Sequence, residues 1–86
     1  MNNFKFAKNL KTAMYENKMT QTELAKKLGT TQQTVSRWLQ GINEPDLNTL
    51  TLICIYLNET PNDLLGFTDL KNGEIIPPIS IDDINN

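Results

Sequence analysis

The sequence has no histidine and only one cysteine, and each of these features excludes a class of chemistry. Without histidine, the chain lacks both the usual base of a hydrolytic triad and the commonest metal ligand. The single cysteine, Cys54, cannot form an internal disulfide or a zinc site built from several cysteines. A glycine-rich loop of the kind that cradles phosphates is also missing. We therefore expect no enzyme activity, no metal and no cofactor.

Long apolar runs are missing as well. The longest, residues 50–57, is interrupted by Thr51 and is far shorter than the roughly 20 residues of a membrane-spanning helix. The N-terminal segment carries lysines, but no apolar stretch long enough for a signal peptide follows them. These features predict a cytoplasmic protein without a membrane partner.

The net charge is only −2, but the two halves of the chain have opposite signs. Residues 1–41 hold six lysines and Arg37 against two glutamates, a net of +5. Residues 42–86 hold Lys71 against eight carboxylates, a net of −7. Because salt limits the reach of a charge to about 10 Å, a nucleic acid responds to the nearest surface rather than to the total. The basic half is therefore the candidate nucleic-acid surface.

A chain of 86 residues is long enough for one domain with a small apolar core. Apolar residues near the N-terminus recur at steps of three and four, which predicts an amphipathic helix over residues 4 to about 17. Its inward residues are expected to be Phe6, Leu10, Ala13 and Met14.

A second helix is predicted by its boundary residues. Thr20 and Glu23 have the spacing of a capping box, so the helix should begin at about Gln21. Gly29 is suited to the left-handed conformation that ends a helix, because it has no Cβ. The buried residues of this helix are expected to be Leu24, Ala25 and Leu28.

A third helix should follow after a tight turn. Thr31 is a good N-cap, and the pattern then predicts a helix over residues 32–40 that ends at Gly41. Val35 and Trp38 are expected on its inward face, because their spacing places them on one side.

Two further helices complete the predicted domain. Residues 42–46 are expected to form a loop, and residues 47–57 a fourth helix. Residues 61–65 should form a short fifth helix with Thr60 as N-cap and Gly66 at its end. The inward stripe of the fourth helix is expected to be Leu50, Ile53, Cys54 and Leu57.

The sequence therefore predicts an all-α domain of five helices over residues 4–67, followed by a short C-terminal tail over residues 68–86. Two adjacent prolines exclude a helix through the middle of this tail. Ile79 and Ile81 alternate as in a short strand, so the tail is predicted to be either a flexible end or an extension that contacts a partner.

The segment of residues 20–41, TQTELAKKLGTTQQTVSRWLQG, resembles the helix-turn-helix of lambdoid phage repressors and xenobiotic-response-element regulators, called the Cro/CI type. The resemblance covers about residues 6–66, because the capping box, the turn glycine and the later helices all agree with it. It implies a lambda-repressor-like fold, with the helix-turn-helix motif at residues 21–40. It also implies binding of double-stranded DNA through the third helix.

The resemblance assigns roles to residues on the exposed side of the third helix. Gln32 and Gln33 are expected to contact bases, since glutamine can pair with adenine N6 and N7 in the major groove. Ser36 and Arg37 lie on the same polar face, and Arg37 is expected to reach a guanine or a phosphate. Gln21 is expected to meet a phosphate and to brace the third helix. The weaker candidates for contacts with the DNA backbone are Thr31, Asn43, Lys8 and Lys26.

Each of these functional roles has a simpler structural alternative. The two glutamines could be ordinary exposed helix residues, Arg37 a plain surface cation, and the lysines a solvated face. Two positions also depart from the family pattern, because Leu39 and Ile42 are apolar where the family usually has charged residues. Each implies either extra packing within the chain or a surface that faces a partner.

The functional prediction is a small transcriptional regulator, expected to be a repressor, that binds an inverted-repeat operator in double-stranded DNA as a homodimer. The fifth helix, Phe67 and the isoleucine tail are the expected dimer contacts. The alternative is an antitoxin or protein-interaction module whose tail binds a partner protein, because isoleucines alternate with acids after Phe67.

Overall fold

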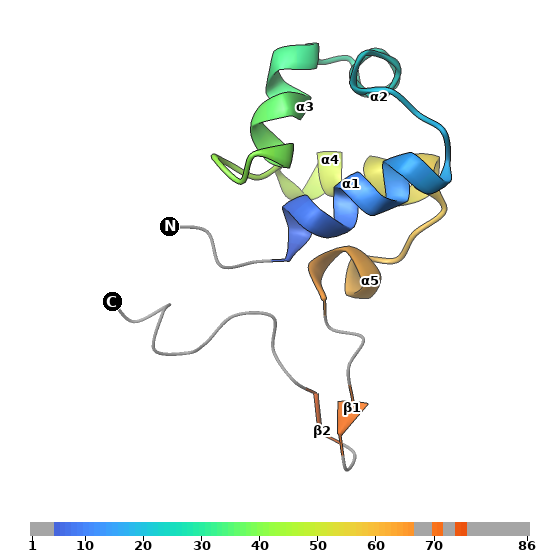
Figure 1. The fold of residues 1–86 in the computed structure, drawn as a ribbon, viewed down its shortest axis with the longest axis vertical. Coiled ribbons are helices and arrows are strands. Elements are labelled where there is room, and N and C mark those ends of the chain that lie inside the picture. The colour runs from blue at the N-terminus through green and yellow to red at the C-terminus, as the bar shows by residue number, and fades with distance from the viewer. Residues whose placement is uncertain (1–4, 67–69, 72–73, 76–86) are drawn as a thin grey trace.

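The computed structural model describes residues 5–66, 70–71 and 74–75. It contains α1 (Phe6–Glu16), α2 (Gln21–Leu28), α3 (Gln32–Leu39), α4 (Leu47–Leu57), α5 (Pro61–Leu65), β1 (Leu70–Lys71) and β2 (Glu74–Ile75) (Figure 1). The predicted all-α class with five helices is confirmed. Within this part of the chain, no helix is long and apolar enough to span a membrane.

The helices share one apolar core. Every predicted inward residue of the first helix is buried, and so are Val35 and Trp38 of α3. Leu28 and Leu50 were also predicted to be buried, but they are only half-buried at the edge of the core. The buried residues are Phe6, Leu10, Ala13, Met14, Leu24, Ala25, Val35, Trp38, Ile53, Cys54, Leu57 and Leu64.

Contacts between helices place the helix-turn-helix at one end of the domain. α1 contacts both α3 and α5, while α2 contacts α3 and α4, and α4 contacts α5. Figure 1 shows α2 and α3 together at the top and α5 at the opposite end, with α1 crossing between them. The exposed side of α3 therefore faces away from the later helices.

Side-chain caps fix where four helices begin. Thr20, Thr31 and Thr60 each have extended backbone, and each hydroxyl accepts a hydrogen bond from the backbone N–H three residues later. These caps were predicted. The cap of α4 was not: the Asp46 carboxylate accepts from the Thr49 N–H at 2.8 Å. This bond, together with the adjacent Thr49 side chain, lowers the pKa of Asp46.

Left-handed residues fix where helices end. Gly29 has φ of 70° after α2, as predicted for a residue without a Cβ. α4 ends instead at Asn58, with φ of 54°, and the chain also turns at Lys18 with φ of 54°. Neither of these positions was predicted, because asparagine and lysine signal a left-handed turn less strongly than glycine.

Two asparagines join α1 to helices that lie far away in the sequence. Asn9 Nδ2 donates to the carbonyl oxygens of Asp63 and Leu64, at 3.0 and 3.1 Å. Asn17 Nδ2 donates to the carbonyl of Leu57 at 3.0 Å. The last carbonyls of a helix have no partner within the helix, so these amides satisfy the C-terminal ends of α5 and α4.

A short antiparallel hairpin follows the helices. Leu70 pairs with Ile75, and Lys71 with Glu74. This hairpin was not predicted from the sequence. The strand-like alternation of Ile79 and Ile81 lies outside the described residues, as does most of the tail.

We predict that Asn9→Ala lowers the free energy of unfolding by about 1 to 2 kcal/mol, because the last carbonyls of α5 lose their side-chain donor. Urea denaturation of the full chain measures this change. The matched control is Asn48→Ala, an exposed asparagine on α4, which should stay within about 0.5 kcal/mol of the unmodified protein. Equal stabilities of the two variants would contradict the prediction.

Candidate nucleic-acid interface

α3 presents one polar face to solvent and buries the opposite one. Gln32, Gln33 and Arg37 are exposed, Ser36 is half-buried, and Val35 and Trp38 lie in the core. An eight-residue helix is about 12 Å long, which is close to the width of the DNA major groove. Burial of Val35 and Trp38 fixes the rotation of α3 about its own axis, and it therefore determines which side chains a groove can reach.

The Gln21 and Gln32 side chains are joined. Gln32 Nε2 donates to Gln21 Oε1 at 2.6 Å, which ties the start of α2 to the start of α3. A glutamine amide has two N–H donors and one oxygen acceptor. Gln32 therefore keeps one N–H and its oxygen, the pair that adenine N7 and N6 require, and Gln21 keeps its NH₂ group for an anion.

The other polar residues of this face differ in whether their side chains already make hydrogen bonds. Within residues 5–66, no hydrogen bond or ion pair involves the side chains of Gln33 or Arg37. Ser36 Oγ accepts from Gln40 Nε2 at 2.9 Å, so its hydroxyl still has a proton to donate. This bond to Gln40 was not predicted. It follows from the i, i+4 spacing of the two residues on one helix.

Thr31 is occupied by its role as N-cap. Its Oγ1 accepts from the Thr34 N–H at 3.1 Å and lies 2.9 Å from the Thr34 hydroxyl. These contacts fix the first turn of α3, whose free backbone N–H groups point toward the same end as Gln32. The start of a helix carries a partial positive charge that favours phosphate.

The orientation of α2 is fixed by its capping box. The Thr20 hydroxyl accepts from the Glu23 N–H at 3.1 Å, and the Glu23 carboxylate accepts from the Thr20 N–H at 3.0 Å. The backbone hydrogen bond from Thr20 is the main cause that lowers the pKa of Glu23, followed by the Thr20 side chain. The capping box places Gln21 in the first turn of α2, at the position where it meets Gln32.

The remaining candidates are spread over other elements. Lys8 is exposed on α1, Lys26 on α2 and Asn43 in the loop after α3. In the described part of the chain, no hydrogen bond connects any of these three side chains to the polar face of α3. They are therefore separate points around α3 and not part of its polar face.

The two positions that depart from the family pattern have different environments. Leu39 is half-buried and packs against the core, so its apolar character has an explanation within the chain. Ile42 is 63% exposed in the loop after α3. This loop also holds Glu44 and leads to Asp46, and acidic residues there do not favour a phosphate contact.

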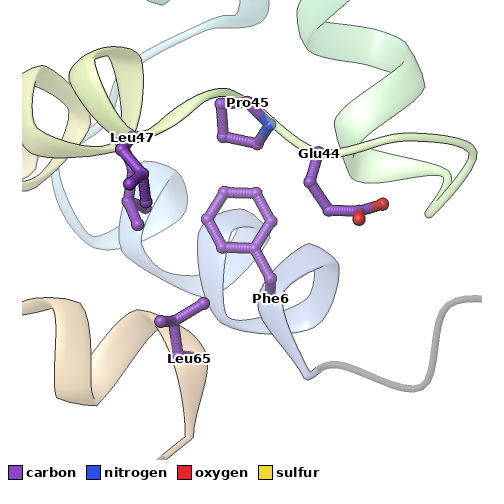
Figure 2. Close-up of a pocket in the computed structure, with 6 residues that line it drawn as sticks. Phe6, Glu44, Pro45, Leu47 and Leu65 are labelled. Atoms are coloured by element: carbon purple, nitrogen blue, oxygen red, sulfur yellow. The ribbon is translucent and has the colours of Figure 1, made fainter. Parts of the chain in front are cut away.

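A small hollow lies on the other side of this loop. It is lined by Phe6, Glu44, Pro45, Leu47, Leu50 and Leu65. Figure 2 shows the Phe6 ring facing Pro45, with Leu47 and Leu65 around it and the Glu44 carboxylate pointing away. At about 220 Å³ and with an almost wholly apolar lining, it is smaller than typical ligand sites of roughly 300 Å³ or more. The polar face of α3 is therefore the stronger candidate site.

Residues 9–74 match the family described as the Cro/C1-type HTH DNA-binding domain. No curated protein matches the chain. The match begins within α1 and extends past α5 to β2, so it includes the whole helix-turn-helix.

Several solved structures share the fold. A transcriptional regulator from Listeria innocua is 24% identical with a TM-score of 0.70, over 81% of this chain and 66% of that one. The SOS-response transcriptional repressor LexA from Eubacterium rectale is 26% identical with a TM-score of 0.69, over 88% of this chain and 83% of that one. Hydroxypropylphosphonic acid epoxidase from S. wedmorenis is 33% identical with a TM-score of 0.70, over 87% of this chain. The chain spans only 41% of the epoxidase, so that likeness concerns less than half of the enzyme.

We predict that the contribution of the capping box to stability depends on pH. Because the pKa of Glu23 is lowered from 4.5 in the folded protein, its carboxylate stabilises the fold above that value and loses this effect as the pH falls through the folded pKa. Glu23→Gln keeps the reciprocal hydrogen bond without the charge.

Thermal unfolding from about pH 6 to about pH 3 should therefore show an advantage of the unmodified protein over Glu23→Gln that disappears at the acidic end. Glu16→Gln, which changes an exposed residue outside the capping box, is the control. A difference that stays constant over the whole range would contradict the prediction.

Proposed function

The chain belongs to the family of Cro/C1-type HTH DNA-binding domains, and we propose that it is a sequence-specific transcriptional repressor that reads double-stranded DNA with α3. The observation that carries the proposal is the exposed polar face of α3, whose first residue is held by Gln21 through the 2.6 Å bond to Gln32. A helix that recognises bases works best when its side chains are already oriented before DNA binds, and the bond to Gln21 orients the Gln32 amide in this way.

Base recognition is assigned to four residues of α3. Gln32 and Gln33 lie in its first turn, where each can present an oxygen and an N–H to adenine. Arg37 lies one turn further along, exposed and without a partner in the described residues, where it can reach guanine O6 and N7. Ser36 can donate its hydroxyl proton to a base edge between them. Discrimination between sequences depends on these contacts because phosphates are the same in every sequence.

Contacts with the DNA backbone are assigned to residues that flank α3. The free NH₂ group of Gln21 lies at the N-terminus of α2, where the helix dipole also favours a phosphate. Thr31 lies at the corresponding end of α3, while Lys8 and Lys26 supply positive charge from α1 and α2. Asn43 is the candidate from the loop after α3. These contacts provide affinity that falls as salt rises.

The repressor is proposed to act in the cytoplasm as a homodimer on an inverted repeat. A two-fold dimer places one α3 in each of two successive major grooves about 34 Å apart, which doubles the number of bases read. Repression needs only that the bound protein occupies the promoter, so the proposal requires no second activity. The solved LexA structure with this fold is described as a repressor. The alternative in which the tail binds a partner protein stays a prediction, because most of the tail lies outside the described residues.

We predict that Gln33→Ala relaxes discrimination at one base pair by about 1 to 3 kcal/mol, because a bidentate base contact is lost. Lys8→Ala should instead weaken binding to all sequences alike and reduce its dependence on salt. Asn62→Ala, which removes an exposed amide on α5 outside the helix-turn-helix, is the control and should leave base preference unchanged. Uniform losses for both Gln33→Ala and Lys8→Ala would contradict the assignment of base readout.

The function itself is tested by selecting binding sites for the purified full chain from a random duplex library at two salt concentrations. A two-fold symmetric site should be enriched at both. Weak binding that enriches no site and disappears as salt rises would overturn the proposal, because it would reflect phosphate contacts alone.

A further inference from the structure

α4 has a solvent-exposed surface that is largely apolar and without charge. No charged residue occurs between Asp46 and Glu59, so the whole helix is uncharged. Leu52, Ile55 and Tyr56 are 40%, 66% and 38% exposed. We call the side of the helix that carries Asn48, Thr51, Leu52, Ile55 and Tyr56 the α4 face. Leu47 at the start of α4 is also exposed but lines the hollow beside Phe6.

The apolar residues of this face adjoin one another. Ile55 and Tyr56 lie three and four residues after Leu52, which makes them neighbours on the helix surface. Single exposed apolar residues are ordinary, but adjacent exposed apolar side chains on an uncharged helix are typical of a surface that a partner covers. The core covers only the side of α4 that carries Ile53, Cys54 and Leu57.

α5 offers no such surface in the described part of the chain. Leu64 is buried and Leu65 half-buried against the core, which leaves Pro61, Asn62 and Asp63 exposed. The α4 face is thus a better apolar contact for a dimer than the fifth helix expected from the family resemblance. Phe67 lies outside the described residues.

We infer that the α4 face packs against the same face of a second copy of this chain, with the two helices antiparallel about a two-fold axis. This inference rests on the proposed homodimeric function and names its interface. Residues near a two-fold axis meet their own copies, so any charge there would face a like charge. An uncharged helix is what such a contact requires.

The ends of the helix provide complementary charge. Asp46 lies at the N-terminal end of α4, and Lys27 lies near the C-terminal end, with its Nζ 5.5 Å from the centre of the Tyr56 ring. In an antiparallel pair, the Asp46 end of each helix lies beside the Lys27 end of the other. The positive N-terminal end of each helix dipole then also lies beside the negative C-terminal end of the other. Glu23 also interacts with Lys27, and Glu59 is half-buried at the same end, so these carboxylates offset part of the Lys27 charge and the helix dipoles add to the preference for the antiparallel pair. A parallel arrangement would instead bring like charges together.

The size of the contact sets its strength. An 11-residue helix is about 16 Å long, so a contact centred on it buries less than the roughly 1,200 Å² of stable protein interfaces. The dimer is therefore weak in free solution and forms chiefly when two copies occupy one operator. The inverted repeat then binds with an affinity greater than two independent half-sites provide.

The test compares Ile55→Lys with Tyr15→Lys in the full chain. Both variants replace an exposed apolar residue by lysine, at 66% and 85% exposure, so they match in charge and both add attraction to DNA. Ile55→Lys should bind the selected inverted repeat at least about tenfold more weakly than Tyr15→Lys does, while the two variants bind an isolated half-site equally. Tyr15→Lys should retain cooperative binding. The inference is overturned if Ile55→Lys binds the inverted repeat as tightly as Tyr15→Lys does.

A second measurement locates the axis. Leu52 is the middle residue of α4, so oxidation of Leu52→Cys on the operator should give a covalent dimer, whereas Tyr15→Cys should not. The native Cys54 is buried and does not compete. Absence of the crosslink from Leu52→Cys on the operator overturns the antiparallel arrangement. If the unmodified chain showed no base preference even on a half-site, the proposed function would be overturned instead. Specific half-site binding without the crosslink would overturn only the dimer interface.

Discussion

Burial of one shared apolar core is the constraint on which every helix of this domain depends. The helices have between 5 and 11 residues, and isolated helices shorter than about 12 residues are marginal in water. α3 is helical because Val35 and Trp38 are held in the core, and their burial also determines that Gln33 and Arg37 face outward. The same packing therefore produces the fold and the surface proposed to read DNA.

Short helices also need hydrogen-bond partners for the backbone N–H and C=O groups at their ends, because these groups make up a larger fraction of a short helix. The hydroxyl caps at Thr20 and Thr31 fix the first turns of α2 and α3, and Gly29 allows the chain to reverse between them. The bond between Gln21 and Gln32 is possible because both residues occupy first turns defined by these caps. Interactions that look purely structural thus position the amides of the candidate site.

Sequence patterns could predict the helices because these are governed by neighbours a few residues apart. The 3.6-residue period and the caps placed α1 to α5 within about two residues of their bounds, and the exposed face of α3 followed from the same period. The contacts of Asn9 and Asn17 could not be predicted, since their partners lie 40 to 55 residues away. The exposure of α4 was missed for a related reason. A run of apolar residues indicates burial, but only the packed neighbours decide which side is covered. The bases that α3 contacts depend on DNA and stay a prediction.

The distribution of charge explains how a chain with a net charge of −2 can still favour one orientation on DNA. Within residues 5–66 the positive side chains lie on or next to α1, α2 and α3, whereas Glu44, Asp46, Glu59 and Asp63 all follow α3. Attraction to phosphate is strongest for the helix-turn-helix end, and the acidic loop and the α5 end are repelled. An uncharged α4 lies between these regions, neither attracted to DNA nor repelled by it. Its exposed face is therefore left to an apolar contact, which is the kind of contact that two copies held on one operator can make.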